Sequence, residues 1–499
     1  MAGASDLNTR FETARDLLRT DRPAEALAAL DEVLRRDPRH LPALVSRGSA
    51  LLALGRLDEA EAAWRGALAR HPGQDVVLWN LGMLLIERER HAEALALADE
   101  ALAAAPAHGR ALLLRGDALA NLSRFEEAVA TFQRIPTTGD LAADALTKEA
   151  LAQAALQRYD AALALLDRAI ALRPGDLFAT FRRAIVRLAT RDFGGWDDYE
   201  ARWRLPFFLA RSGGVVTREL APRLTLKPTL DDLAGQRVLL LGEQGIGDEV
   251  MFASLIPDLI GVAKAVACVC DERLVGLFSA SFPGVSFAGP RQARISLAAI
   301  DRFVAMGSLG GLFRPTEAAF PGTPYLAPRP EARARWAERL GPRRRRLRIG
   351  LSWRGGLPTT RRSLRSLDWT QLAPILDLPD CEFVSLQYGD VAAELAAAPV
   401  PIRAFAPGEI DDFEELAALT AGLDAVVSVQ TALVHLCGAI GQPCLTLVPH
   451  NPEWRYTAVG STMPWYRSVR LFRQAEPGNW APVVAQAADA LRARLGASS

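Results

Sequence analysis

The sequence has few cysteines and no excess of charge of either sign. Its 499 residues include five cysteines, and 58 basic side chains balance 58 acidic ones. Without a net positive field, the chain does not fit the proteins that coat nucleic acid. Cys268 and Cys270 stand two apart on an expected strand, where thiols behave as small apolar side chains; a metal site is the alternative interpretation.

Long apolar runs are also missing. None approaches the ~20 residues that a membrane-spanning helix needs. The N-terminus, MAGASDLNTRFETARDLL, lacks the apolar stretch of a signal peptide. We therefore expect a soluble, cytoplasmic protein without a membrane span. The chain is too long for one hydrophobic core, so two or three domains are expected.

The first 204 residues repeat themselves every 34 positions. Alanines recur at positions 26, 60, 94, 128 and 162, and prolines keep the same period at 38, 72, 106 and 174. Small residues on paired helices let the two axes approach, and each proline ends a helix before the next pair begins. The pattern resembles the tetratricopeptide repeat, about 34 residues per helix pair. It predicts an α-helical solenoid over 1–204, with five repeats and a degenerate sixth, FATFRRAIVRLATRDFGGWDDYEARWR.

A solenoid of this kind has a concave groove lined by the first helix of each pair. In the expected register the lining side chains are apolar: Phe11, Val45, Leu52, Trp79, Met83 and Ile86. Such a groove suits an amphipathic helix of a protein partner. Packing between neighbouring repeats is the alternative role for some of these side chains.

An apolar run and a glycine-rich turn begin the second half of the chain. In QRVLLLGEQGIGDEVMFAS, residues 236–254, a strand enters a turn with Gly242, Gly245 and Gly247, and a helix begins at Asp248. The G-x-x-G-x-G spacing fits neither the dinucleotide fingerprint nor a P-loop. A ligand-binding turn, with free N–H groups at a helix N-terminus, and a plain strand-to-helix turn both agree with this pattern.

Short apolar segments then alternate with helical ones, which predicts a parallel α/β fold. Residues 205–235 lack periodicity and contain three prolines, so they are interpreted as a linker. One αβα unit is expected over 236–342, with strands at 265–270, 285–287 and 301–306. A second is expected over 343–499, with strands at 348–353, 381–386, 425–429 and 444–448. Four arginines at 343–346 suit a solvated linker better than a phosphate site.

Several ordered motifs of residues 190–499 resemble one family. They are GEQGIGD with FASLIP, GLSWRGG, RSLRSLDW, FVSLQYGD, and SVQTALVHLCGAIGQPCLTLVP followed by EWRY and PWYRSVRLFRQ. Together they resemble heptosyltransferase-like glycosyltransferases, especially bacterial proteins that fuse this domain to tetratricopeptide repeats. The resemblance implies a GT-B fold, a pair of Rossmann-like αβα units facing each other across a cleft that holds a nucleotide sugar.

The resemblance also implies roles for single residues. Asp248 takes the place of the family's proposed general base. Thr431 and Ala432 open a helix whose N–H groups would hold the donor phosphate, and Arg365 with Ser366 would clamp phosphate or carboxylate oxygens. The donor-binding residues implied in this way are Gly245, Gly247, Ser352, Trp353, Arg354, Arg365, Ser366, Gln387, Gln430, Thr431, Ala432 and His435.

One position departs from the family pattern. The family usually has an acidic residue, thought to meet sugar hydroxyls, where this chain has Gln430. Glutamine keeps the hydrogen-bonding capacity and drops the negative charge, so it suits an acidic donor sugar better than aspartate does. The change puts either activity or sugar identity in question.

Four residues of the quoted motifs also fit a purely structural role. His435 fits a packed core histidine, Trp353 and Trp465 fit core or domain-interface aromatics, and Asp248 fits a helix cap.

These expectations combine into a metal-independent, inverting glycosyltransferase without a cofactor beyond its nucleotide-sugar donor. The chain has no D-x-D motif and no cluster of His and Asp side chains. Its groove would capture a protein acceptor such as a flagellin-like subunit, and Asp248 would remove the acceptor proton. Two rivals remain: an interaction protein whose transferase domain is inactive, and a lipopolysaccharide or other saccharide glycosyltransferase.

Overall fold

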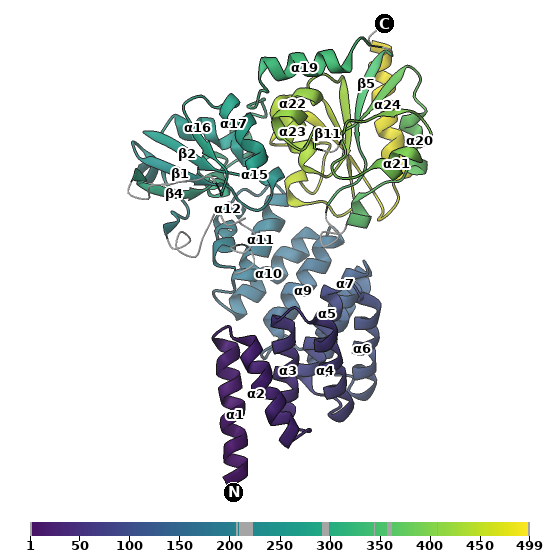
Figure 1. Cartoon of the computed structure of the whole chain (residues 1–499). Coiled ribbons are helices and arrows are strands. Elements are labelled where there is room, and N and C mark those ends of the chain that lie inside the picture. The colour runs from purple at the N-terminus through teal and green to yellow at the C-terminus, as the bar shows by residue number, and fades with distance from the viewer. Residues whose placement is uncertain are drawn as a thin grey trace. The chain divides into compact units, whose positions relative to one another are not determined.

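The computed structural model describes residues 2–205, 208, 223–291, 299–343, 345–356, 362–406 and 408–497. It divides into two compact units, Met1–Pro174 and Gly175–Ser499. Their elements are labelled in Figure 1.

The first unit is built of helices that pair along the chain. Its described helices are α1 (Ala2–Arg19), α2 (Pro23–Arg36), α3 (Leu41–Ala53), α4 (Leu57–Arg70), α5 (Asp75–Glu87), α6 (His91–Ala104), α7 (Gly109–Asn121), α8 (Phe125–Phe132), α9 (Ala142–Ala155) and α10 (Tyr159–Leu172). The predicted helical solenoid is confirmed for this unit. The helix ends precede the repeated prolines, and α8 is short where the sequence reads IPTTGD.

The 34-residue period is also present in the backbone. The turn between the two helices of each pair contains a residue in the left-handed region, with φ between 59° and 72°: Asp21, Gly55, Glu89, Ser123, Gln157 and Arg191. The last of these lies in the degenerate sixth repeat. That repeat therefore keeps the turn geometry although its sequence has diverged.

Small residues let the paired helices approach, as the sequence predicts. A Cβ atom added to Gly48 would lie 2.2 Å from the indole of Trp64, and one added to Gly116 would lie 2.2 Å from the ring of Phe132. The repeated alanines are fully buried. The core of this unit is thus a continuous stack of small and large side chains.

The sixth repeat belongs to the second compact unit. Its helices are α11 (Leu177–Ala189), α12 (Gly195–Tyr199) and the 3₁₀ helix η1 (Glu200–Arg204). Trp196 of α12 packs edge-on against Trp454 and Trp465, whose ring centroids lie 5.8 and 6.4 Å away. The predicted boundary at residue 204 therefore differs from the compact units, which divide before Gly175. The large aromatic side chains of this repeat explain the difference, because they are buried among α/β residues.

The predicted linker is partly structured. Within 205–235, the described residues include a bridge from Leu224 to Phe303 and a short helix, α14 (Leu230–Leu233), with a Thr229–Asp232 capping box. Residues 206–207 and 209–222 lie outside the described part of the chain.

A four-stranded parallel sheet follows, with the order β3-β2-β1-β4. Its strands are β1 (Arg237–Leu241), β2 (Ala265–Val269), β3 (Ser286–Ala288) and β4 (Arg302–Ala305). The intervening and following helices are α15 (Ile246–Phe252), η3 (Ala253–Leu255), α16 (Ile256–Ile260), η4 (Glu272–Leu274), α17 (Val275–Ser281), η6 (Met306–Leu309), α18 (Gly310–Phe313), η7 (Glu317–Ala319) and α19 (Pro330–Leu340). One face packs on α15–α17, and a small cluster around Trp203 covers the other.

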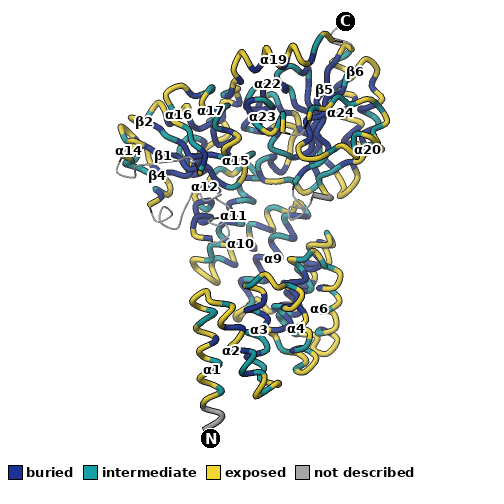
Figure 2. Tube along the Cα trace, in the orientation of Figure 1, coloured by how far each residue is buried: buried dark blue, intermediate teal, exposed yellow. Residues whose placement is uncertain are grey.

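A seven-stranded sheet completes the unit, with the order β10-β11-β9-β8-β5-β6-β7. Its elements are β5 (Leu347–Ser352), η9 (Arg362–Arg365), α20 (Trp369–Leu376), β6 (Cys381–Ser385), α21 (Ala392–Ala396), β7 (Ile402–Arg403), α22 (Phe413–Thr420), β8 (Ala425–Val429), α23 (Ala432–Ile440), β9 (Cys444–Val448), η10 (Trp454–Tyr456), β10 (Thr462–Met463), β11 (Tyr466–Arg473) and α24 (Ala481–Ala497). The pairs are parallel except β10–β11. The central strands β5, β8 and β9 are buried throughout; β5 is labelled in Figure 2.

The segment around the predicted boundary at residue 342 differs from the prediction in one detail and agrees with it in another. Helix α19, expected in the first αβα unit, packs on α22: the Trp336 indole donates to Glu415 at 2.7 Å and its ring meets Phe405. In the basic run that follows, Arg343 pairs with Asp424 at 2.7 Å. This arginine acts as a structural contact, in agreement with the linker interpretation.

Candidate functional site

The glycine turn carries Asp248 on the first turn of α15. Gly245 is the N-cap of this helix, with extended backbone and no side-chain cap. Asp248 is the third helical residue, and its carboxylate pairs with Arg455 instead of capping N–H groups. The helix-cap interpretation of Asp248 therefore does not describe its contacts.

The same turn packs directly on the helix that the resemblance assigns to the donor. A Cβ atom on Gly247 would lie 3.2 Å from the His435 ring and 3.3 Å from the Cα atom of Ala432. Both belong to α23, which begins where β8 ends. Gly247 is thus small because helix α23 approaches it. The two motifs, far apart in the sequence, meet at the carboxyl ends of their strands, where parallel sheets place ligand sites.

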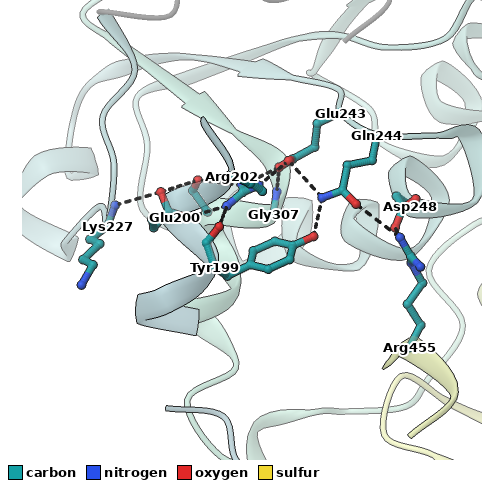
Figure 3. A network of polar contacts seen from close by, with 10 residues as sticks. Tyr199, Glu200, Arg202, Lys227, Glu243, Gln244, Asp248, Gly307 and Arg455 are labelled. Carbon is teal, nitrogen blue, oxygen red and sulfur yellow. Dashed lines mark hydrogen bonds and ion pairs between the residues drawn. The ribbon is translucent and has the colours of Figure 1, made fainter. Parts of the chain in front are cut away.

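Arg455 connects Asp248 to a buried polar network (Figure 3). Its Nε and Nη2 atoms both contact Oδ1 of Asp248, and Nη2 donates to Oε1 of Gln244 at 3.3 Å. The amide of Gln244 in turn donates to the hydroxyl of Tyr199 on α12. Gln244 has a left-handed backbone, with φ +69°, which is unusual for this residue type.

Farther along the network, Arg202 of η1 is fully buried. It binds both oxygens of Glu243, at 2.7 and 2.8 Å, and Oε1 of Glu200 at 2.8 Å. Glu243 also accepts from the backbone N–H of Gly307 at 2.6 Å. The degenerate repeat therefore holds the glycine turn through the buried ion pair of Arg202 with Glu243. Glu243 also binds the segment after β4, through the N–H of Gly307.

Burial dominates the electrostatics of the turn. It raises the pKa of Asp248 to about 6, although Arg455 lowers it. Burial also raises the pKa of Glu249 to about 8, so this neighbouring acid is largely protonated at neutral pH. With a pKa of about 6, Asp248 is mostly ionised at neutral pH, which suits a general base.

The N-terminus of α23 holds an unpaired buried amide. Thr431 is the N-cap and accepts from the N–H of Leu433 at 3.3 Å. Gln430, one residue earlier, is 3% exposed, and neither its amide nitrogen nor its oxygen has a hydrogen-bond partner among the described residues. Leaving both groups unpaired costs free energy, so this position is a candidate for contact with a bound molecule.

Gly355 lies between the backbones of Gln430 and Arg365. A Cβ atom on Gly355 would lie 2.9 Å from the backbone carbonyl oxygen of Gln430 and 3.2 Å from that of Arg365. The Arg365 side chain pairs with Glu453 at 3.3 Å, and Glu453 lies 3.7 Å from Arg455. Charged contacts thus lead from Arg365 through Glu453 and Arg455 to Asp248.

His435 has the contacts of a packed histidine. It is 3% exposed, and its Nδ1 atom lies 3.2 Å from the hydroxyl of Tyr466. Burial lowers the pKa of His435 to about 3, so the ring is neutral. Its described contacts, with Gly247 and Tyr466, hold the two halves of the site together.

The residues near the end of β5 that are predicted to bind the sugar donor form hydrogen bonds with Gln387, another predicted donor-binding residue. The amide oxygen of Gln387 accepts from the backbone of Trp353 and Arg354, both at 2.9 Å, and lies 3.2 Å from the hydroxyl of Ser352. Trp353 is buried against Trp369, in agreement with the core interpretation. The guanidinium of Arg354 pairs with Glu394, and residue 354 forms an isolated bridge with Ser366.

Trp465 also has the contacts of a core aromatic. It packs edge-on against Phe320 and Phe252, whose ring centroids lie 4.8 and 6.0 Å away.

The hollow in the repeat groove lies within the first unit. Leu52, Trp79, Met83 and Ile86 line one hollow of about 390 Å³. Leu52 and Met83 are each 37% exposed. Phe11 and Val45 are not among the residues that line this hollow: the Phe11 ring meets His40, and the Val45 carbonyl accepts from the Trp64 indole at 3.1 Å. Trp79 and Ile86 pack against the repeat core as Phe11 and Val45 do, so lining and packing are not separate roles for these side chains.

Some functional candidates are visible only in three dimensions. Arg455 is part of the EWRY motif but has no sequence signal that connects it to Asp248, 207 residues earlier. Tyr199 and Arg202 belong to a repeat whose divergence gives no hint of this role. Glu243 stands out in the sequence as an acid beside the glycine turn.

Metal-binding clusters and membrane-spanning helices are both absent from the described residues. No group of three or more His, Cys, Asp or Glu side chains could hold a metal ion in that part of the chain. Among the same residues, no helix combines the length and apolar character that crossing a bilayer requires.

The chain contains tetratricopeptide repeats in its N-terminal part, followed by an α/β region. Residues 11–75 and 80–144 match the family model of the tetratricopeptide repeat. The chain is 34% identical over 349 residues to Protein FlbA of Caulobacter vibrioides, an alignment that covers 64% of this chain and 56% of FlbA. This chain thus spans about half the length of that curated relative.

Among solved structures, the chain is similar to repeat proteins. YrrB, a repeat protein with an unusual peptide-binding site, is 24% identical, with a TM-score of 0.28 over 35% of this chain and 90% of YrrB. A thermophilic repeat protein of Thermus thermophilus, TTC0263, is 22% identical, with a TM-score of 0.31 over 36% of this chain and 99% of that protein.

Proposed function

We propose that the chain is a glycosyltransferase that moves a sugar from a nucleotide-sugar donor to a protein acceptor held by the repeat groove. One observation carries the proposal: the glycine turn of Asp248 packs on the N-terminus of α23, beside the unpaired amide of Gln430. A candidate base and an anion-friendly helix end therefore share one site.

The chemistry follows from these positions. Asp248 takes the proton of an acceptor hydroxyl as its oxygen bonds to the anomeric carbon of the sugar. The bond from that carbon to the donor phosphate breaks, and the electron pair leaves with the phosphate. The N–H groups at the start of α23 and the side chain of Arg365 stabilise the leaving phosphate. A single displacement of this kind inverts the anomeric centre.

The charges at the proposed donor site suit an acidic sugar. Gln430 offers a donor and an acceptor without negative charge, so a carboxylated sugar meets no repulsion from it. Arg365 provides a cation nearby.

The groove supports a protein acceptor. Leu52, Trp79 and Met83 present an apolar lining, and the cation of Arg110 lies 6.0 Å from the Trp79 ring. An amphipathic helix of a secreted appendage subunit, for example one like flagellin, fits such a surface and gains local concentration at the site.

Two experiments on the full-length chain test the proposal. A thermal-shift screen of nucleotide sugars, carboxylated ones included, is expected to show one class that stabilises the protein, because ligands that bind the folded state raise its stability. Incubation of the full-length chain with that donor and a flagellin-like subunit is expected to increase the intact mass of the subunit by one sugar per modified site.

A groove variant separates capture of the acceptor from chemistry. Trp79→Ala with Met83→Ala is expected to raise the acceptor KM about 10-fold or more and to leave donor affinity unchanged, since a loss of ~1.4 kcal/mol of apolar contact is already enough for a 10-fold change. Leu172→Ala is the control, because this side chain is equally exposed, at 52%, but ends α10, the second helix of its pair, and does not line the hollow. Donor binding without any sugar transfer would favour an interaction protein, and transfer only to saccharides would favour a saccharide glycosyltransferase.

A further inference from the structure

Arg455 binds one oxygen of the candidate base and leaves the other open. Both Nε and Nη2 of Arg455 contact Oδ1 of Asp248. The second oxygen, Oδ2, accepts no hydrogen bond from the residues that the structure describes. It lies on the side of Gly245, whose added Cβ atom would be 3.7 Å away. The carboxylate therefore has a fixed oxygen and a free one.

Arg455 is itself held in place from three sides. Nη2 donates to Gln244 at 3.3 Å, Nη1 lies 3.7 Å from Glu453, and the guanidinium carbon lies 5.3 Å from the ring centroid of Trp454. Gln244 is fixed in turn by the hydroxyl of Tyr199. A planar guanidinium with several fixed partners orients a carboxylate better than a flexible ammonium does.

The surroundings of Asp248 make this cation necessary. The charged and titratable groups that face it come from the turn, from its own helix and from the elements packed on it: Glu243, Glu249, Tyr199, His435, Glu453, Arg455 and Tyr466. Arg455 is the nearest cation in this group, while Glu243 and Glu453 are acids that disfavour a second negative charge. Without Arg455, burial and these acids would protonate Asp248 at neutral pH.

We propose that Arg455 is a positioning residue for the transfer reaction: it fixes Oδ1 of Asp248, keeps the carboxylate charged, and aims Oδ2 at the acceptor hydroxyl. This role rests on the proposed function. It assigns to Arg455 no contact with the donor phosphate, which Arg365 and the start of α23 bind.

The test compares Arg455→Met and Arg455→Lys with the wild type, using the donor found in the thermal-shift screen. The wild-type kcat is expected to fall on the acid side near pH 6. In Arg455→Met the acid limb is expected to move up by about one pH unit or more, and the plateau to fall about 10-fold or more. Arg455→Lys restores most of the charge and thus the position of the limb, but only part of the plateau. Donor Kd stays within about 2-fold in both variants.

Arg470→Met is the control, because this exposed arginine lies on β11 outside the site. An unchanged pH profile in a folded Arg455→Met variant would overturn the positioning role and leave the transferase intact. A donor Kd more than 10-fold weaker, with no shift of the limb, would make Arg455 a phosphate ligand instead. A wild-type chain that transfers no sugar would refute the proposed function and the role of Arg455 with it.

Discussion

The buried arginine of the sixth repeat gives a prediction whose size follows from the structure. Arg202 is 0% exposed and donates to Glu243, Glu200, the Tyr199 carbonyl and the Ser308 hydroxyl at 2.7–3.1 Å. Arg202→Met keeps most of the side-chain volume but removes the charge. Glu243 and Glu200, 2% and 7% exposed, then lose their cation.

Breaking a buried ion pair from one side costs about 3–5 kcal/mol, because the remaining charge stays desolvated. That is a large fraction of the roughly 5–15 kcal/mol that stabilises a typical domain. Urea unfolding followed by tryptophan fluorescence is a suitable assay, because eight of the ten tryptophans lie in the second compact unit. The fluorescence midpoint is expected to fall markedly.

Two matched variants make the assay decisive. Arg237→Met removes a pair with Asp301 of similar geometry, but the two side chains are 44% and 31% exposed, so the midpoint is expected to change little. Adding Glu243→Gln to Arg202→Met neutralises the stranded acid and is expected to recover part of the loss. If Arg202→Met lowers the midpoint no more than Arg237→Met does, the buried network does not hold the glycine turn.

Two further predictions concern the repeats and the donor site. Gly48→Ala is expected to destabilise the first unit by about 1–3 kcal/mol, since its Cβ would lie 2.2 Å from the buried Trp64 ring. Gly66→Ala, also inside a helix but facing only the flexible end of Arg70, is expected to stabilise it slightly; equal melting temperatures for the two variants would contradict this packing. Arg365→Ala is expected to weaken donor binding in calorimetry by ~1.5–3 kcal/mol if it binds the phosphate, and unchanged affinity would exclude it.

The helical repeats could be predicted well because each pair is specified locally. The 34-residue period fixes small residues at the helix contacts, and the structure shows these contacts at Gly48 and Gly116. The parallel strands were also accessible, since buried strands such as β8 and β9 are continuous apolar runs. Strand β11 was missed because its polar arginines and Ser468 interrupt the apolar pattern.

The site could be predicted only in part. Strand ends such as β1 and β8 predicted where Asp248 and Thr431 would lie, because parallel strands bring their carboxyl ends together. The pairing of Asp248 with Arg455 joins residues 207 apart, and no spacing rule connects them. Ser352 and Gln387 show what position alone cannot decide: they lie at strand ends and hydrogen-bond to each other, and their role in donor binding stays a prediction.

The most direct test of the account is the turnover of Asp248→Asn in the full-length chain with the identified donor and a protein acceptor. The variant keeps the size of the side chain but cannot take a proton. We predict a fall in kcat of about 100-fold or more, with donor Kd and melting temperature close to those of the wild type. A folded variant that transfers sugar at a near-normal rate would contradict the claim that Asp248 is the base.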